Sequence, residues 1–258
     1  MSAPPPKKSL GQHFLVDDNI LGVIGRLAEL GPGDVALEIG PGLGVLTQTL
    51  AERCTYVHAI ELDRRLEPSL RELAAAPNVS LHWGDALRLD LSQLDPVPTK
   101  LVANLPYNVA TPIVAESLDG LPSIDSWCVM VQREVADRFF AVPSTKAYGA
   151  VSVLIQLAAV RTGFHPVSRS VFRPPPNVDS ALVAFHRIPL PDGFATIRRV
   201  VEGAFAHRRK TLANSLELAG VASRASVAAA LETLDLDPAV RAEALLPPVF
   251  VDLTRKIA

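Results

Sequence analysis

Two short motifs, about sixty residues apart, combine residue types that suit the transfer of a small group to an amine. Residues 38–44 (EIGPGLG) form a glycine-rich turn after an apolar run, and Glu61 closes the next apolar run. Glycines let the backbone approach a ligand closely, and a carboxylate at the second strand end accepts hydrogen bonds from ribose hydroxyls. Residues 104–107 (NLPY) place a carboxamide, a proline and an aromatic ring after a later run. Together the motifs predict a nucleoside cofactor held beside a planar amine that is to be methylated.

The glycine spacing favours one nucleoside cofactor over another. Gly40, Gly42 and Gly44 follow a GxGxG pattern without the third glycine of the dinucleotide fingerprint, which favours S-adenosylmethionine over NAD. Asp85 and Ala86 follow a third apolar run, where the carboxylate is expected to accept from the adenine amino group and Ala86 leaves room for the ring. A simple turn is the alternative for this pair alone. Acceptors at successive strand ends nevertheless gather at one edge of a parallel sheet, where ligands bind.

The second motif predicts how an amine is prepared for methylation. The exocyclic amine of adenine is a poor nucleophile, so its two N–H groups need acceptors that align it with the methyl group. We assign these roles to the side-chain oxygen of Asn104 and the carbonyl of Leu105, which Pro106 leaves without a competing N–H. Tyr107 is expected to stack on an extruded base. Phe172, held by three following prolines, is expected to close the other face of that base, with a buried loop anchor as the alternative.

Alternating strand and helix patterns provide the frame that positions these residues. Apolar runs typical of seven strands are Val35–Ile39, Tyr56–Ile60, Val79–Trp83, Lys100–Ala103, Trp127–Gln132, Ala158–Phe164 and Ala181–His186. Helical spacing follows an Asp17 or Asp18 cap and recurs near residues 44–52, 64–75, 111–118, 134–140 and 150–156. We therefore predict an α/β fold of the Rossmann-like, class I methyltransferase type with a seven-stranded, mostly parallel sheet.

The remaining sequence predicts a second, smaller domain. Residues 188–193 (IPLPDG) read as a linker, and the chain from residue 195 to 257 has only helical patterns. We assign residues 17–189 to a catalytic domain that binds S-adenosylmethionine and residues 190–258 to a small all-α C-terminal domain.

Composition narrows the class of protein. The chain has 258 residues, a net charge of −2 and only two cysteines, Cys54 and Cys128, so a disulfide or zinc site is not expected and no metal is assigned. No apolar run has membrane-span length and no signal peptide is evident, so we expect a cytoplasmic protein without membrane contact. Charge is uneven: residues 1–160 carry a balance of −6 and residues 161–258 one of +4. A basic C-terminal part can grip phosphates locally.

With these motifs in view, the chain resembles the rRNA adenine-N6,N6-dimethyltransferase family, and its bacterial small-subunit branch in particular. Residues 11–15 (GQHFL) resemble an N-terminal box that lies over the cofactor, so residues 1–16 are expected to cover that site. Residues 37–47, 59–63, 84–85, 104–108 and 172–180 match further family motifs in order and spacing. The resemblance implies S-adenosylmethionine as cofactor and carries over cofactor contacts to the following residues: His13, Leu15, Gly40, Glu61, Asp85 and Asn104. We expect the cofactor site also to include Gln12, Glu38, Gly42, Leu62 and Ala86.

The resemblance also implies a substrate. The expected reaction methylates N6 of two adjacent adenosines in the 3′-terminal hairpin loop of small-subunit rRNA, within an immature 30S particle, and we expect a monomer. Residues 208–216 and 238–243 resemble the small-subunit branch specifically. Two alternatives remain: a large-subunit rRNA methyltransferase that confers antibiotic resistance, and a non-catalytic assembly or transcription factor with the same fold. Loss of the motif at residues 104–107 would favour the factor, but the motif is intact.

A basic cluster is the candidate RNA contact. Residues 207–210 (HRRK) are expected to open a helix, where cations oppose the helix dipole and need a partner. We assign Arg208, Arg209 and Lys210 to RNA binding, with a solvated or internally paired face as the alternative.

Overall fold

The computed structural model describes residues 4–7 and 10–257, which divide into two compact units. The first unit runs to Ala136 and returns for Arg161–Arg187, and the second comprises Asp137–Val160 and the chain from Ile188 onward. Residues 137–160, which the sequence placed with the catalytic part, thus cluster with the C-terminal helices. The division of the chain into functional domains stays a prediction.

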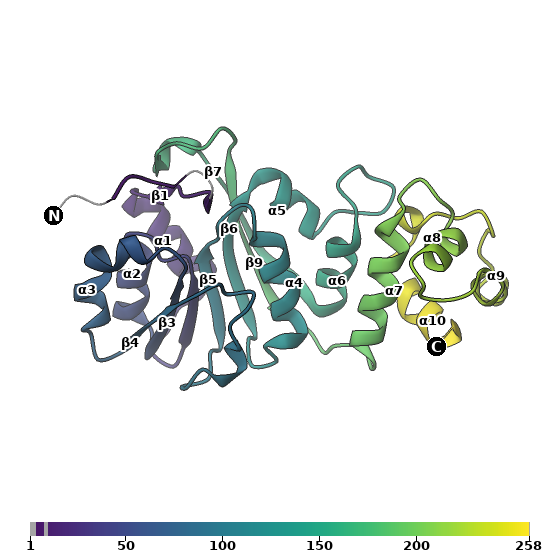
Figure 1. Cartoon of the computed structure of the whole chain (residues 1–258), viewed down its shortest axis with the longest axis horizontal. Coiled ribbons are helices and arrows are strands. Elements are labelled where there is room, and N and C mark those ends of the chain that lie inside the picture. The colour runs from purple at the N-terminus through teal and green to yellow at the C-terminus, as the bar shows by residue number, and fades with distance from the viewer. Residues whose placement is uncertain (1–3, 8–9, 258) are drawn as a thin grey trace. The chain divides into compact units, whose positions relative to one another are not determined.

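A seven-stranded sheet forms the centre of the first unit (Figure 1). Its strands are β2 (Val35–Ile39), β3 (Tyr56–Glu61), β4 (Val79–Trp83), β5 (Lys100–Asn104), β6 (Ser126–Gln132), β7 (Ala159–Val167) and β9 (Ser180–Arg187). Their order is β4-β3-β2-β5-β6-β9-β7. The pairs from β4 to β6 are parallel, whereas β6 and β9 are antiparallel. The predicted seven-stranded, mostly parallel sheet is therefore confirmed, and six of its seven strands lie within two residues of their expected bounds.

Helices cover both faces of this sheet, which is why its central strands are continuous apolar runs. Three helices lie on one face: α1 (Asp18–Leu27), α2 (Val45–Arg53) and α3 (Glu67–Ala74). The opposite face is covered by α4 (Ala110–Gly120), from which the Ser117 hydroxyl accepts a hydrogen bond from Trp127 Nε1 at 2.8 Å. Asp17 caps α1 as expected, because its carboxylate accepts from the backbone N–H groups of Asn19 and Ile20.

Two very short strands that no sequence pattern predicted lie beside this sheet. They are β1 (Phe14–Leu15) and β8 (Phe172–Arg173), which pair antiparallel with Phe14 opposite Arg173 and Leu15 opposite Phe172. A two-residue strand is too short for an alternating pattern to be recognised. This pairing attaches the N-terminal segment to residues 172–173, which belong to the last stretch of the chain in the first unit.

The second unit is helical, apart from the first two residues of β7. Its helices are α6 (Ala150–Ala158), α7 (Phe194–Ala206), α8 (Leu212–Leu218), α9 (Arg224–Thr233) and α10 (Pro247–Ile257), and α5 (Arg133–Phe139) continues from β6. The first unit has short 3-10 helices at Arg64–Leu66, Leu91–Gln93 and Arg169–Val171, and the second has one at Ala242–Ala244. Tyr148 anchors this unit: its buried ring meets Phe205 edge-on, and its hydroxyl donates to the Leu245 carbonyl at 2.7 Å. Within the described ranges, no helix combines the length and apolar character that crossing a membrane requires.

Candidate active site

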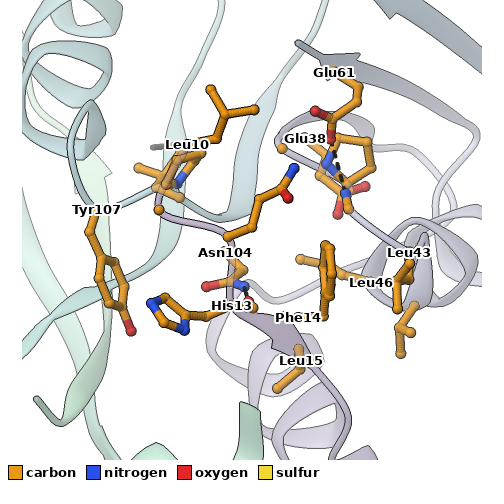
Figure 2. Close-up of a pocket in the computed structure, with 18 residues that line it drawn as sticks. Leu10, His13, Phe14, Leu15, Glu38, Leu43, Leu46, Glu61, Asn104 and Tyr107 are labelled. Atoms are coloured by element: carbon orange, nitrogen blue, oxygen red, sulfur yellow. Dashed lines mark hydrogen bonds between the residues drawn. The ribbon is translucent and has the colours of Figure 1, made fainter. Parts of the chain in front are cut away.

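A pocket lies at the edge of the sheet where β2, β3 and β5 end (Figure 2). The structure brings most of the predicted site residues to its lining: Gln12, His13, Leu15, Glu38, Gly40, Gly42, Glu61, Asn104, Leu105, Pro106 and Tyr107. In the view of Figure 2, Asn104 lies between Tyr107 and His13 on one side and Glu38 and Glu61 on the other. Their gathering follows from parallel strands, whose carboxyl ends meet at a single edge.

The glycine turn after β2 lets other segments close on the pocket. Gly40 and Gly42 have φ angles of 78° and 60°, in the left-handed region that favours glycine. A Cβ on Gly40 would lie 3.2 Å from the Pro106 ring, and one on Gly42 would lie 3.0 Å from the Phe14 ring. The Gly40 N–H donates to the Ile60 carbonyl at 2.9 Å, which ties the turn to β3. Side chains at these positions would force the turn, the N-terminal segment and the second motif apart.

Glu61, the last residue of β3, presents a buried carboxylate to the pocket. Its Oε2 accepts from the Gly42 N–H at 3.2 Å and its Oε1 from the Asp63 N–H at 2.7 Å. Burial raises the pKa of Glu61, while these backbone donors act in the opposite direction. The carboxylate is thus fixed in orientation, with the further lone pairs that ribose hydroxyls need.

Asp63 is a structural partner of the site that the sequence analysis missed. Its carboxylate accepts from Gln12 Nε2 at 2.9 Å and from Arg65 Nη2 at 2.6 Å. The Arg65 guanidinium holds the pKa of Asp63 well below its usual range. An aspartate two residues before an arginine at the start of a helical turn was the available signal. Through Gln12, Asp63 attaches the N-terminal segment to the end of β3.

Glu38 is the most enclosed acid of the pocket. Its side chain is 1% exposed, and its Oε2 accepts a hydrogen bond from Thr47 Oγ1 at 2.6 Å. Burial raises the pKa of Glu38 to about 8, the Thr47 hydrogen bond opposes the rise and the charge of Glu61 adds to it. Thr47, from α2, is a second partner that the sequence did not reveal.

The amide of Asn104 is oriented by the N-terminal segment. Its Nδ2 donates to the His13 carbonyl at 3.2 Å, which leaves Oδ1 as the acceptor of this side chain. The Leu105 N–H donates to the Met130 carbonyl at 3.0 Å, so the peptide that follows Asn104 is anchored to β6. Two acceptors, Asn104 Oδ1 and the Leu105 carbonyl, are therefore held on adjacent residues at the pocket.

Tyr107 is braced at both ends of its side chain. Its ring stacks on the His13 ring, with centroids 5.5 Å apart and planes at 29°. Its hydroxyl shares a hydrogen bond with Ser180 Oγ at 2.6 Å, and burial raises the pKa of Tyr107. His13 is in turn held by its Nδ1, which donates to the Pro174 carbonyl at 2.8 Å. His13 and Tyr107 thus form an aromatic wall, and a third part of the chain, with Pro174 and Ser180, holds this wall in place.

Phe172 does not lie where a second stacking ring was expected. Its side chain is 2% exposed and is part of the core cluster that includes Leu15, its partner in the pairing of β1 and β8. It is absent from the residues that line the pocket. In this structure Phe172 takes the place of a buried loop anchor, the alternative that the sequence left open.

The predicted adenine contacts lie at the same sheet edge but outside the pocket lining. Leu62 and Asp85 follow β3 and β4, which pair up to Glu61 and Trp83. The Leu62 side chain is 53% exposed, a large apolar surface directly beside Glu61. Asp85 Oδ1 accepts from the Leu87 N–H at 3.0 Å in a local turn, and Ala86 lines a separate pocket against α4. Their assignment to the cofactor stays a prediction.

The basic cluster differs in position from its prediction. Residues 207–210 do not open a helix, because they lie in the turn after α7 and before α8. Arg208 is paired within its own unit: its guanidinium donates to the carbonyls of Lys146 and Tyr148 and lies 3.5 Å from the Glu243 carboxylate. Arg209 and Lys210 are exposed, and among the described residues neither side chain has a partner. The internally paired alternative thus fits Arg208 alone.

The donor set of the pocket fits a positively charged nucleoside. The pocket is lined by two buried carboxyl groups, by a carboxamide and by a glycine turn that leaves room for a ligand to approach closely. No described lysine or arginine lines it. Such a pocket accepts hydrogen bonds from hydroxyl and ammonium groups and attracts a cation. S-adenosylmethionine has ribose hydroxyl groups, an ammonium group and a positively charged sulfonium, so it matches the pocket in all three respects.

Comparison with known proteins places this geometry in a family. Residues 5–246 match the family described as "Ribosomal RNA adenine dimethylase". The chain is 46% identical over 257 residues to "Ribosomal RNA small subunit methyltransferase A" of Rubrobacter xylanophilus, covering 99% of this chain and 96% of the relative. It is 43% identical to the protein of the same name from Lactiplantibacillus plantarum, covering 96% and 88%.

Solved structures agree with this placement. A dimethyladenosine transferase from Plasmodium falciparum shares the fold with a TM-score of 0.77 at 24% identity, covering 93% of this chain and 96% of that one. The 23S rRNA methyltransferase ErmE superposes with a TM-score of 0.67 at 30% identity, covering 95% and 99%. The chain therefore belongs to the ribosomal RNA adenine dimethylase family and is an S-adenosylmethionine-dependent rRNA adenine dimethyltransferase.

Proposed function

We propose that this enzyme dimethylates N6 of two adjacent adenosines in the 3′-terminal hairpin loop of small-subunit rRNA, in an immature 30S particle. Relatives that are 43–46% identical over nearly the whole chain carry the name small-subunit methyltransferase A. The 23S rRNA enzyme ErmE is less similar, at 30% identity. This difference supports the small subunit over the large-subunit alternative.

The observation that carries the chemistry is the pair of acceptors at Asn104 and Leu105. S-adenosylmethionine, when bound, supplies an electrophilic methyl group. Asn104 Oδ1 and the Leu105 carbonyl accept the two N–H groups of the target amine and turn its lone pair toward that methyl group. Pro106 has no backbone N–H, so it does not compete with the amine for these acceptors. The methylated amine is acidic enough to lose its proton to water, so no strong base is needed.

The aromatic wall of Tyr107 and His13 is proposed to receive the target base. A flipped base stacks on aromatic rings, and each ring contributes about 1–3 kcal/mol. The stacked His13 ring and the Ser180 hydroxyl hold Tyr107 in one orientation before any RNA arrives. Because Phe172 is buried, the second face of the base needs a different partner.

The adenosine end of the cofactor is proposed to extend from Glu61 toward Leu62, Asp85 and Ala86. Glu61 accepts from the ribose hydroxyls, and Asp85 accepts from the adenine amino group. The exposed Leu62 side chain offers the apolar surface that an adenine ring covers. Glu38 faces the methionine part of the cofactor, which carries the sulfonium.

The other parts of the chain have supporting roles in this proposal. The N-terminal segment of residues 1–16 covers the cofactor with its described residues 10–16, while residues 1–3 and 8–9 of that segment lie outside the described part of the chain. Residues 17–189 carry out catalysis, and the helical part from residue 190 contributes cations that grip rRNA phosphates. The enzyme acts as a monomer in the cytoplasm. An intact motif at residues 104–107 argues against a non-catalytic assembly factor that keeps the fold.

Primer extension on rRNA tests this proposal. Dimethylated adenines stop reverse transcriptase, so rRNA from a strain that lacks the protein should lose two adjacent stops in the small-subunit hairpin loop. Purified enzyme and cofactor should restore them on immature small subunits and leave large-subunit rRNA unchanged. Restored stops in large-subunit rRNA would support the resistance enzyme instead, and no change in either rRNA would support a non-catalytic factor.

A further inference from the structure

The carboxyl group of Glu38 differs from the other acid of the pocket in the groups that hold it. Among the described residues, only Thr47 donates a hydrogen bond to its side chain, at 2.6 Å. A threonine hydroxyl can donate to a carboxylate and can also accept from a carboxylic acid. The site of Glu38 therefore satisfies its charged form and its neutral form.

Glu61 has no such choice. It is held by the backbone N–H groups of Gly42 and Asp63, at 3.2 and 2.7 Å. A backbone N–H can only donate, so these contacts favour the carboxylate. These donors oppose the rise in the pKa of Glu61 that burial causes, and Glu61 provides an internal comparison for Glu38.

Among the residues that the structure describes, no side chain with a fixed positive charge lines the pocket around Glu38. The titratable side chains that line the pocket are His13, Glu38, Glu61 and Tyr107, and no described lysine or arginine lines it. Two buried carboxylates in one pocket repel each other, so the less well solvated one retains its proton. Burial raises the pKa of Glu38 to about 8, in agreement with this geometry.

The two ligands of such a pocket differ by one charge. S-adenosylmethionine and S-adenosylhomocysteine share the ammonium and carboxylate groups, but only the methyl donor carries a sulfonium. We propose that Glu38 is a neutral acid in the cofactor-free pocket, releases its proton to solvent beside S-adenosylmethionine, and thereby selects the methyl donor over the uncharged-sulfur product. This inference rests on the proposed assignment of the pocket to the cofactor.

The proposal fixes the sign of a pH effect. Binding that releases a proton becomes tighter as the pH rises, by up to about tenfold per pH unit while the free protein holds the proton. Above the pH at which Glu38 ionises in the free protein, the affinity levels off. The product sulfur carries no charge, so its binding releases fewer protons. The preference for methyl donor over product therefore increases with pH and then levels off.

Calorimetry on the full-length protein tests this directly. Binding of S-adenosylmethionine and of S-adenosylhomocysteine is measured from about pH 6 to about pH 9, in buffers of different ionisation enthalpy that reveal the protons released. The wild-type protein should release protons with the methyl donor and fewer with the product. In Glu38→Gln, which keeps an acceptor for Thr47, the ratio of the two affinities should no longer depend on pH.

Glu61→Gln is the matched control. Its predicted ribose contact is common to both ligands, so this variant should weaken the binding of both alike. Because the charge of Glu61 also raises the pKa of Glu38, the proton release should persist but shift to lower pH. Proton release that persists in Glu38→Gln, or is absent from the wild-type protein, overturns the proposal. Failure of the wild-type protein to bind either ligand would instead overturn the assignment of the pocket, and this inference with it.

An infrared difference spectrum gives a readout independent of turnover and of the variant's folding. The cofactor-free wild-type protein should show the C=O band of a buried protonated carboxyl group, which disappears when S-adenosylmethionine is added. The band should also disappear as the pH is raised through about 8. A spectrum without this band in the cofactor-free protein at neutral pH contradicts the proposal.

Discussion

Asn104 reaches the pocket with its amide already oriented, because its Nδ2 donates to the His13 carbonyl at 3.2 Å. We therefore expect Asn104→Ala to fold normally and to lose turnover by about 10²–10³-fold, the usual effect of removing one aligned hydrogen-bond partner in a transition state. Methylation at saturating cofactor, with circular dichroism as the folding control, measures this. A moderate loss of cofactor affinity is compatible with the proposal, but near-normal dimethylation is not.

Glu61, like Asn104, can be tested by a single substitution, but its role is in cofactor binding rather than in turnover. Glu61→Ala should weaken S-adenosylmethionine binding by about ten- to a hundredfold, since hydrogen bonds to a charged group contribute about 1.5–3 kcal/mol. The variant also loses the acceptor of the Gly42 N–H, so the glycine turn should become more mobile. Calorimetric affinity equal to that of the wild type would show that the ribose lies elsewhere.

Two aromatic residues that the sequence treated alike should now behave differently. Tyr107→Ala should weaken the RNA step by about 1–3 kcal/mol with cofactor binding less affected. Phe172→Ala should instead lower the free energy of unfolding by about 3–5 kcal/mol, because it removes a buried ring that packs with Leu15. Urea unfolding and methylation of a short rRNA fragment separate the two effects. A stable Phe172→Ala with a defect confined to RNA would return this ring to the substrate site.

Among the elements, β3 and β4 are joined by a histidine pair as well as by their backbones. His58 Nε2 donates to the Pro96 carbonyl at 2.8 Å, so its Nδ1 accepts from His82 Nε2 at 3.1 Å. This arrangement needs His58 to be neutral, because its Nδ1 accepts, and burial lowers the pKa of both His58 and His82. The unfolded chain then binds more protons, so stability is complete above the unfolded value of about 6.5 and falls as the pH drops below it.

The measurement for this pair is the slope of the free energy of unfolding against pH. Each unit by which folding lowers a pKa contributes about 1.4 kcal/mol to that free energy. His58→Gln should therefore remove the contribution of His58 to the slope between about pH 7 and pH 5. His165→Gln, at a partly exposed position of β7, is the matched control and should leave the slope unchanged. An identical slope in His58→Gln and the wild type would show that the pair does not couple folding to protonation.

The same scale shows what the sequence could predict and what it could not. The central strands were predictable because burial on both faces makes them apolar runs, and the carboxyl ends of β2, β3 and β5 gather Glu38, Glu61 and Asn104. The pairing of β1 with β8 was not, because strands of two residues carry no pattern and their partners are far apart in the chain. Burial of Phe172 accompanies this pairing, so its place in the core rather than at the pocket could not be predicted either.

Side-chain partners across the fold were also beyond sequence reasoning. The prediction that residues 207–210 open a helix was wrong, since α7 ends before them and α8 begins at Leu212. The pairing of Arg208 with Glu243 joins residues that no local pattern relates. Periodicity reports the environment of an element, but it does not report which loop lies against it.

For the whole molecule, the free cations of the cluster set an expectation for RNA binding. Neutralising Arg209 and Lys210 together should weaken binding to immature small subunits and flatten the dependence of log affinity on log salt by up to about two units. Cofactor affinity should not change. Filter binding over a range of salt concentrations measures the slope.

Arg208→Gln is the control for this cluster. Arg208 is committed to the carbonyls of Lys146 and Tyr148 and to Glu243, so its loss should destabilise its own unit and leave the salt slope nearly unchanged. If the double variant keeps the wild-type slope, the phosphates are held by other residues, and Arg208 with its partners is the only part of the cluster that has a role in folding.

The pairing of β1 with β8 has a consequence for the order in which the enzyme is made. Phe14 and Leu15 leave the ribosome long before their partners Arg173 and Phe172, which emerge after strands β2 to β6 have been translated. Until then the carbonyl of Pro174 cannot hold His13, and His13 cannot brace Tyr107. The nascent chain therefore has strands β2 to β6 of its sheet before it can close its pocket, and cofactor binding can stabilise the complete pocket only after residue 174 has been made.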